Sequence, residues 1–140
     1  MLNAPGKKLK PEQVAQIIHQ LCFALKEIHS NNIIHRDIKA ENIYICDDGT
    51  LKILDFGWSN YIEEKNKKRM TYAGTVLYQA PEMIESKIHD HTIDIWSVGV
   101  LMFELLTGRD PFSPDVYKGS EEDIKNEIKM RVIKGKYESK

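Results

Sequence analysis

Three short strings hold the residues of this chain that could do chemistry. HRDIKAEN occupies residues 35–42, DFG occupies residues 55–57 and APE occupies residues 80–82. The first two strings contain Asp37, Lys39, Asn42 and Asp55. A carboxylate can accept a proton, an ammonium group can neutralise an anion, and carboxylate and amide oxygens are ligands that Mg²⁺ prefers. This set suits transfer of a phosphoryl group, which asks a protein mainly for positioning and charge neutralisation.

Each of the four side chains has an expected role in such a transfer. Asp37 is placed to accept the proton of the attacking hydroxyl, and Lys39 can reach the transferred phosphate as a point charge. Asn42 and Asp55 are expected to bind Mg²⁺. A lone DFG carries almost no information, because such tripeptides are common in turns. The order and spacing of all three strings make a chance assembly remote.

The elements around the strings predict how these residues meet. Apolar residues at helical spacing predict an amphipathic helix from residue 11 to about residue 30. Residues 43–46 and 51–54 are short apolar runs joined across DDGT, which predicts a β-hairpin with glycine in its turn. Because Asn42 precedes the first run and Asp55 follows the second, both expected metal ligands lie at one edge of the hairpin.

Three further segments follow the hairpin. Residues 58–75 are polar and charged with no clear period, which predicts a surface loop. Residues 94–106 are apolar almost all round, which predicts a helix in the middle of a core. Residues 121–133 predict a last, more exposed helix. The predicted fold class is therefore α+β, mainly α, with one short hairpin.

The three strings, in this order and spacing, resemble the catalytic half of the eukaryotic protein kinase family. The resemblance implies a partial catalytic domain over residues 1–140, within the large C-terminal lobe of the family. It places a catalytic loop at 35–42, an activation segment at 55–82 and a central helix at about 94–106. No Gly-rich loop and no VAIK-type lysine precede the first string. The small N-terminal lobe and the last helices of the large lobe are therefore expected to be missing.

The resemblance also implies which residues meet substrate and cofactor. The expected cofactors are ATP and Mg²⁺, and the nucleotide is expected to contact Lys39, Glu41, Asn42, Tyr44 and Asp55. At Tyr44 the family usually has a leucine, which forms the floor under adenine. Lys39 and Thr75 match residues that mark serine/threonine kinases. Asp37, Lys39 and Thr75 are accordingly the expected catalytic residues.

Regulatory features follow from the same resemblance. Arg36 matches kinases in which this arginine pairs with a phosphate on the activation segment. Thr71 is the candidate phosphosite, with a solvated threonine as the equal alternative, and an upstream kinase acting on Thr71 is a candidate partner. The DFGWS continuation and the basic residues before Thr71 resemble the Aurora group. Asp94 matches a central-helix aspartate that braces the catalytic loop.

The composition limits which cellular locations and binding partners are expected for this chain. A net charge of −1, from 20 basic and 21 acidic residues, supplies no field to recruit nucleic acid or an anionic membrane. Cys22 and Cys46 lack metal-type spacing and are predicted to be buried free thiols. With no signal-peptide pattern and no apolar run of the ~20 residues that a bilayer requires, an intracellular, cytoplasmic or nuclear protein is expected. The remaining histidines are expected to be surface or packing residues: His19, His29, His89 and His91.

Two functions stay open. The first is a serine/threonine kinase that transfers the ATP γ-phosphoryl group to Ser/Thr hydroxyls of a protein substrate, with Asp37 as base. These 140 residues alone are then expected to show negligible turnover, because the parts that cover ATP are not among them. The alternative is a non-catalytic kinase-like interaction module that binds kinases or their substrates through the surface of residues 78–82 and the last helix. An incomplete lobe would also expose apolar surface around residues 96–106 and the first helix, so self-association is expected.

Overall fold

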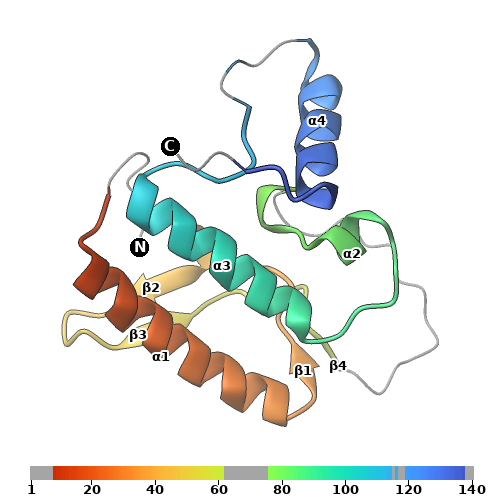
Figure 1. Ribbon diagram of the computed structural model, residues 1–140. Helices are drawn as coiled ribbons and strands as arrows, with labels where there is room; N and C mark the ends of the chain where they lie inside the picture. The colour runs from red at the N-terminus through yellow and green to blue at the C-terminus, as the bar shows by residue number, and fades with distance from the viewer. Residues whose placement is uncertain (1–7, 62–75, 115, 117–118, 138–140) are drawn as a thin grey trace.

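Two long helices form the centre of the computed structural model, which describes residues 8–61, 76–114, 116 and 119–137. Helix α1 (Pro11–Ser30) and helix α3 (Thr92–Thr107) lie side by side and run in opposite directions (Figure 1). The strands form two antiparallel pairs: β1 (Ile33–Ile34) with β4 (Asn60–Tyr61), and β2 (Ile43–Ile45) with β3 (Leu51–Ile53). The expected mainly helical α+β class is confirmed.

Helix α1 has the predicted bounds and buries one face. Its buried residues recur every three or four positions: Val14, Ile17, Leu21 and Leu25. Leu21 and Leu25 belong to the same core cluster as Leu101 and Leu105 of α3. Burying a leucine side chain stabilises a fold by about 1.5–3 kcal/mol, so this contact joins the two helices firmly. None of the described helices is long and apolar enough to cross a membrane.

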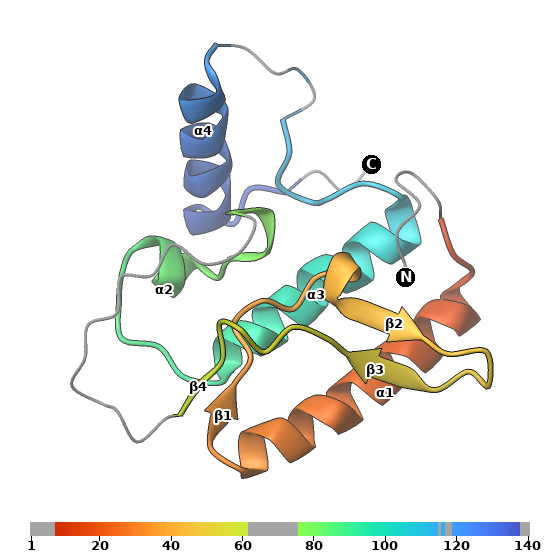
Figure 2. The same ribbon diagram turned by 180° about the vertical axis from the view of Figure 1, so that it is seen from behind.

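The predicted hairpin is also present, and it is fastened to α1. Ile43 of β2 lies opposite Ile53 of β3. Gly49 in the turn has a φ of 82°, in the left-handed region that glycine adopts without a Cβ clash. The Gln20 side chain of α1 donates to the carbonyl of Gly49 at 3.1 Å and accepts from the amide of Leu51 at 3.0 Å. Figure 2, which views the molecule from behind, shows the hairpin lying against α1.

The rest of the described chain is built on short elements. The 3₁₀ helix η2 (Val76–Tyr78) and helix α2 (Pro81–Ile84) contact helix α4 (Glu121–Ile133), which stands away from α1 (Figures 1 and 2). The observed bounds of α4 are those predicted. Ser120 begins α4 with a capping box, in which its hydroxyl accepts from the amide of Asp123 and the Asp123 carboxylate accepts from the amide of Ser120.

Strands β1 and β4 were not expected from the sequence. The prediction of a surface loop over residues 58–75 is wrong near the start of that range, because residues 60–61 pair with residues 33–34. A strand of two residues is too short to show an alternating pattern, so only the pairing itself reveals it. Residues 62–75 lie outside the described part of the chain.

The two cysteines are free but are not both buried as predicted. Cys22 is exposed and Cys46 is half-buried. Cys22 directly follows the buried Leu21, and each residue of an α-helix is turned by about 100° from the one before it. An apolar neighbour in sequence therefore does not imply burial on a helix.

Helix α3 is present, but it is not buried all round. Ile95, Met102 and Leu106 are exposed by 50%, 42% and 38%, respectively. Together with the exposed Gly99 they recur every three or four residues, which places them on one face of the helix. We refer to these four residues as the α3 stripe. The described part of the chain leaves this apolar face largely uncovered.

His35 connects the segments that flank the hairpin. It is fully buried, and its Nε2 lies 3.2 Å from the carbonyl oxygen of Leu54, while its Nδ1 lies 3.3 Å from the backbone nitrogen of Asp37. A carbonyl only accepts and a backbone N–H only donates, so Nε2 carries the hydrogen and Nδ1 is bare. His35 is therefore neutral in the fold. Burial lowers its pKa below the ordinary value of 6.5, although nearby carboxylates, Asp94 first among them, act in the opposite direction.

We expect the free energy of unfolding to fall as the pH is lowered through 6.5, because the unfolded chain can then bind a proton that the folded His35 resists. Urea unfolding at several pH values between about 5 and 7 measures this dependence. His35→Phe should flatten it, and His19→Phe, at an exposed histidine of α1, should leave it unchanged. The same pH dependence in His35→Phe as in the parent chain would contradict the neutral assignment.

Candidate active site

The carboxylate of Asp94 holds the backbone of the HRD string. Its Oδ2 accepts from the amide of His35 at 2.9 Å, and its Oδ1 accepts from the amide of Arg36 at 2.8 Å. Asp94 lies in the first turn of α3 and is fully buried. Hydrogen bonds to an ionised carboxylate are roughly twice as strong as neutral ones. The bracing role that the kinase resemblance implies for Asp94 is confirmed by these contacts.

Two residues of the site have a left-handed backbone. Arg36 has a φ of 71° and Asp55 a φ of 61°, a conformation that costs a residue other than glycine about 1–3 kcal/mol. At Arg36 the bonds to Asp94 offset that strain. At Asp55 the residue's own side chain offsets the strain, because its Oδ1 accepts from the amide of Gly57 at 3.1 Å. Both strained turns are thus held by carboxylates.

Asp37 lies at the centre of a cluster with Lys39 and Asn42. The Nζ of Lys39 lies 2.8 Å from Oδ2 of Asp37. The Nδ2 of Asn42 donates to the same Oδ2 and to the backbone carbonyl of Asp37, both at 2.8 Å. Asp37 itself is only 5% exposed. Three residues of the predicted chemistry are therefore in direct contact.

The hairpin brings Asn42 next to the DFG string. Asn42 ends the 3₁₀ helix η1 (Ala40–Asn42), and its carbonyl accepts from the amide of Leu54 at 2.8 Å. Asp55, the next residue, is exposed. The amide nitrogen of Asn42 is used by Asp37, so its amide oxygen is the atom available to a cation. One amide oxygen and one carboxylate fit Mg²⁺, which takes few protein ligands and keeps its other positions for water and phosphate.

The other predicted site residues are less closely defined. Glu41 is exposed in η1, and Tyr44 is 41% exposed on β2. Arg36 is half-buried beside Asp37. Thr71 and Thr75 lie outside the described residues. Their expected roles in nucleotide contact, specificity and regulation stay predictions.

Helix α3 also holds the segment that contains the APE string. The Tyr78 hydroxyl donates to the Glu104 carboxylate, and the Ser97 hydroxyl donates to the Tyr78 carbonyl at 2.8 Å. Burial raises the pKa of Tyr78, and the bond to Glu104 raises it further. Burial also raises the pKa of Glu104, and this bond partly opposes that increase. One helix therefore positions both the HRD string and η2.

The sequence patterns did not predict that one further residue belongs to this network. His29, expected to be only a surface or packing residue, places its Nε2 2.8 Å from Oδ2 of Asp94. The two residues are 65 positions apart. No local spacing or motif in a single sequence points to that contact.

Comparisons with known proteins agree with the geometry. The pattern of the protein kinase domain family matches residues 1–140. Aurora kinase A-A of Xenopus laevis is 47% identical over 107 residues, which make up 76% of this chain and 26% of that protein. The Aurora kinase of Saccharomyces cerevisiae is 52% identical over 99 residues, which make up 71% of this chain and 27% of that protein.

A third relative extends the similarity along the chain. The Aurora kinase of Debaryomyces hansenii is 42% identical over 129 residues, which cover 91% of this chain and 29% of that protein. The chain thus spans between a quarter and a third of the length of these curated relatives. On the match over all 140 residues and the identity to these relatives, the chain belongs to the protein kinase domain family.

Proposed function

We propose that this chain is the catalytic part of a serine/threonine protein kinase of the Aurora type. The observation that carries the proposal is the contact of a buried Asp37 with both Lys39 and Asn42. The identity to Aurora kinases over most of the chain supports the assignment to that group. The substrate is then a protein with a serine or threonine hydroxyl, and the phosphoryl donor is ATP.

The contacts support a separate chemical role for each residue in phosphoryl transfer. Lys39 and Asn42 both contact Oδ2 of Asp37, so among the described contacts Oδ1 is the oxygen left to accept the proton of the substrate hydroxyl. Lys39, whose ammonium group is next to this carboxylate, neutralises charge on the transferred phosphate. Asn42 and Asp55 would hold Mg²⁺, which supplies further charge neutralisation when bound.

The remaining features of the proposal concern the domain and its regulation. Residues 1–140 form part of the large lobe, with the catalytic loop at 35–42 and the activation segment at 55–82. Phosphorylation of Thr71 by an upstream kinase would place a phosphate on the activation segment that Arg36 can contact. Both cysteines are free, which supports an intracellular, cytoplasmic or nuclear location.

A second candidate function rests on the α3 stripe. Three of its apolar side chains are more than a third exposed, and contiguous apolar surface of this kind marks sites of association. A kinase-like interaction module, or a self-associating chain, would use this face. The side chains of the stripe are exposed whereas Asp94 is buried, so both functions can reside in one molecule.

Titration with ATP in Mg²⁺ tests the proposed metal edge. We expect Asp55→Asn to weaken Mg·ATP binding by at least about tenfold, because a charged metal ligand is lost. In a chelator, the parent chain and Asp55→Asn should bind ATP equally. Asp47→Asn, at another exposed carboxylate of the hairpin, is the control. Mg²⁺-dependent binding that survives Asp55→Asn unchanged would show that the edge is assigned wrongly.

Phosphoryl transfer tests the role of Asp37. These 140 residues include no Gly-rich loop, so we expect transfer to a serine/threonine peptide once the chain is fused behind the ATP-covering segment of an Aurora relative. Asp37→Asn should then lower kcat by at least about a hundredfold, the range for loss of a general base. Asp47→Asn should leave kcat unchanged. Transfer that is insensitive to Asp37→Asn would refute the proposed base.

Analytical ultracentrifugation tests the α3 stripe. We expect the chain to self-associate at micromolar concentration and Met102→Glu to shift it towards the monomer, because a charge cannot be buried in an apolar contact without a large penalty. Met130→Glu is a matched control, since Met130 of α4 is exposed to a similar extent, 48% against 42%. Equal effects of the two substitutions, or a parent chain that is monomeric throughout, would exclude self-association through this face.

A further inference from the structure

An open groove of about 530 Å³ lies at the C-terminal end of α4. Its walls are the C-terminal half of the helix and the residues that directly follow it, up to Tyr137. Neither wall contains any of the residues assigned to phosphoryl transfer. The groove is therefore a surface that the proposed kinase chemistry does not use.

Backbone hydrogen bonds fix the shape of this groove. Gly135 has a left-handed φ of 61°, and its amide donates to the carbonyl of Val132 at 3.0 Å. The amide of Lys136 donates to the carbonyl of Arg131 at 2.9 Å. These two bonds form a Schellman motif, which ends α4 and turns the chain. Lys136 and Tyr137 thereby line the same groove as the helix they follow.

Two exposed side chains give the groove an apolar surface. Met130 is 48% exposed and Tyr137 is 60% exposed. Ile128 and Val132 of the same helix are buried in the main core cluster, so α4 is anchored without Met130 or Tyr137. Methionine and tyrosine are enriched where proteins meet, and methionine adapts its shape to a partner. The two residues suit an apolar side chain of another molecule.

The groove is also cationic. Arg131 is paired with Glu127, since its Nη2 lies 3.1 Å from Oε1 of that carboxylate. Lys134 and Lys136 line the groove as well, and neither forms an ion pair with any residue that the structure describes. The dipole of a helix favours cations at its C-terminal end, which accounts for lysines at these positions. Their ammonium groups are still open to carboxylates of another molecule.

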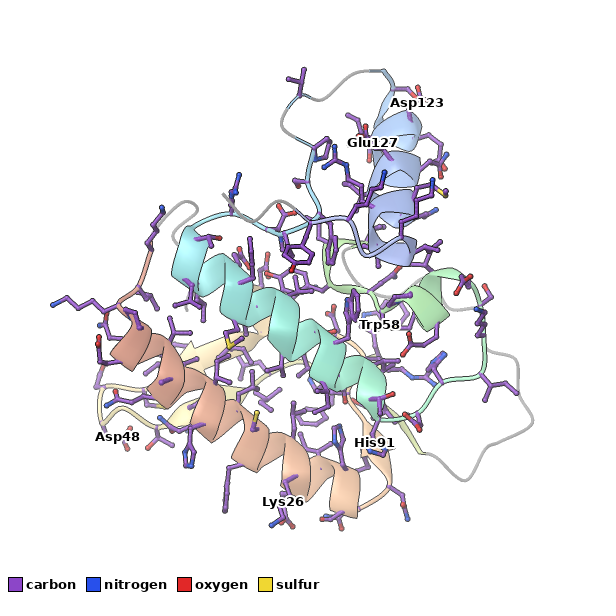
Figure 3. All side chains as sticks on the ribbon, viewed as in Figure 1. Lys26, Asp48, Trp58, His91, Asp123 and Glu127 are labelled. Atoms are coloured by element: carbon purple, nitrogen blue, oxygen red, sulfur yellow. The ribbon has the colours of Figure 1, made fainter. Side chains whose placement is uncertain are left out.

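The charge of α4 favours a short anionic ligand over a long one. The first turn of the helix is acidic, with Glu121, Glu122 and Asp123. Figure 3 shows Asp123 at that end of α4 and Glu127 further along the helix. A nucleic acid laid along α4 would be repelled by the acidic turn, whereas a short acidic segment confined to the groove would not.

We propose that the groove at the end of α4 binds an acidic peptide segment of a partner protein, with an apolar or aromatic residue among its carboxylates. The apolar residue contacts Met130 and Tyr137, and the carboxylates pair with Lys134 and Lys136. Such charge complementarity speeds encounter and selects the partner. The proposal goes beyond the kinase assignment and does not depend on phosphoryl transfer by Asp37.

Fluorescence anisotropy with the 140-residue chain tests this proposal. The probe is a labelled peptide in which one phenylalanine is flanked on both sides by aspartates and glutamates. We expect saturable binding, which Lys134→Glu combined with Lys136→Glu should weaken at least about tenfold, because two attractive contacts become repulsive. Met130→Ala keeps a good helix former and should weaken binding at least about threefold through lost apolar contact. A probe with alanine in place of phenylalanine should bind the parent chain and Met130→Ala equally.

The matched control is Lys26→Glu combined with Lys52→Glu, at two exposed lysines outside α4. Lys26 lies on α1, far from α4 (Figure 3). Because these two substitutions change the net charge of the chain by the same amount but leave the groove intact, the control should keep the affinity of the parent chain for the probe.

Four results would overturn the proposal. Equal weakening by the two double substitutions would show attraction to overall charge alone. A parent chain without saturable binding below about 1 mM would show that the groove is not a peptide site. Tighter binding of a single-stranded oligonucleotide of the same charge would make the ligand a nucleic acid. Loss of self-association in the Lys134→Glu and Lys136→Glu chain would show that the acidic turn of a second copy occupies the groove.

Discussion

The site depends on one buried carboxylate. Asp94 stands in the first turn of α3 and binds two consecutive amides of the HRD string, one of which belongs to a residue in the left-handed region. A buried carboxylate that loses its hydrogen-bond partners strongly destabilises a fold, so the folded chain must keep both of these bonds. The rigid helix α3 thereby dictates where Asp37 lies. Removal of the carboxylate would free the loop that carries the expected base.

The hairpin supplies the second constraint. It folds the chain back so that the carbonyl of Asn42 meets the amide of Leu54, and His35 then connects Leu54 to Asp37 from inside the core. The ring of His35 also lies edge-on to Phe56, with centroids 4.8 Å apart. Residues that are far apart in sequence are therefore held by backbone bonds and one neutral imidazole. A flexible linkage could not hold the expected base and the two expected metal ligands in register.

Helix α3 has different roles on its two sides. Towards the core, Asp94 and Ser97 hold the segments that carry the HRD and APE strings. On the other side, the α3 stripe presents apolar atoms to solvent. The proposed phosphoryl transfer and the proposed association would therefore depend on different faces of one helix. A substitution in the stripe can test association without touching the cluster around Asp37.

Local sequence patterns were enough to predict the motifs and the regular elements around them. The bounds of α1 and α4, the β2–β3 hairpin and the identity of Asp37, Lys39, Asn42 and Asp55 all follow from local spacing, because periodicity and turn residues are properties of neighbouring positions. Tertiary packing, by contrast, produces the β1–β4 pairing, the contact of His29 with Asp94 and the exposure of Cys22 and the α3 stripe. These features depend on which distant segments pack together and which faces they leave uncovered, and one chain's local pattern does not record either.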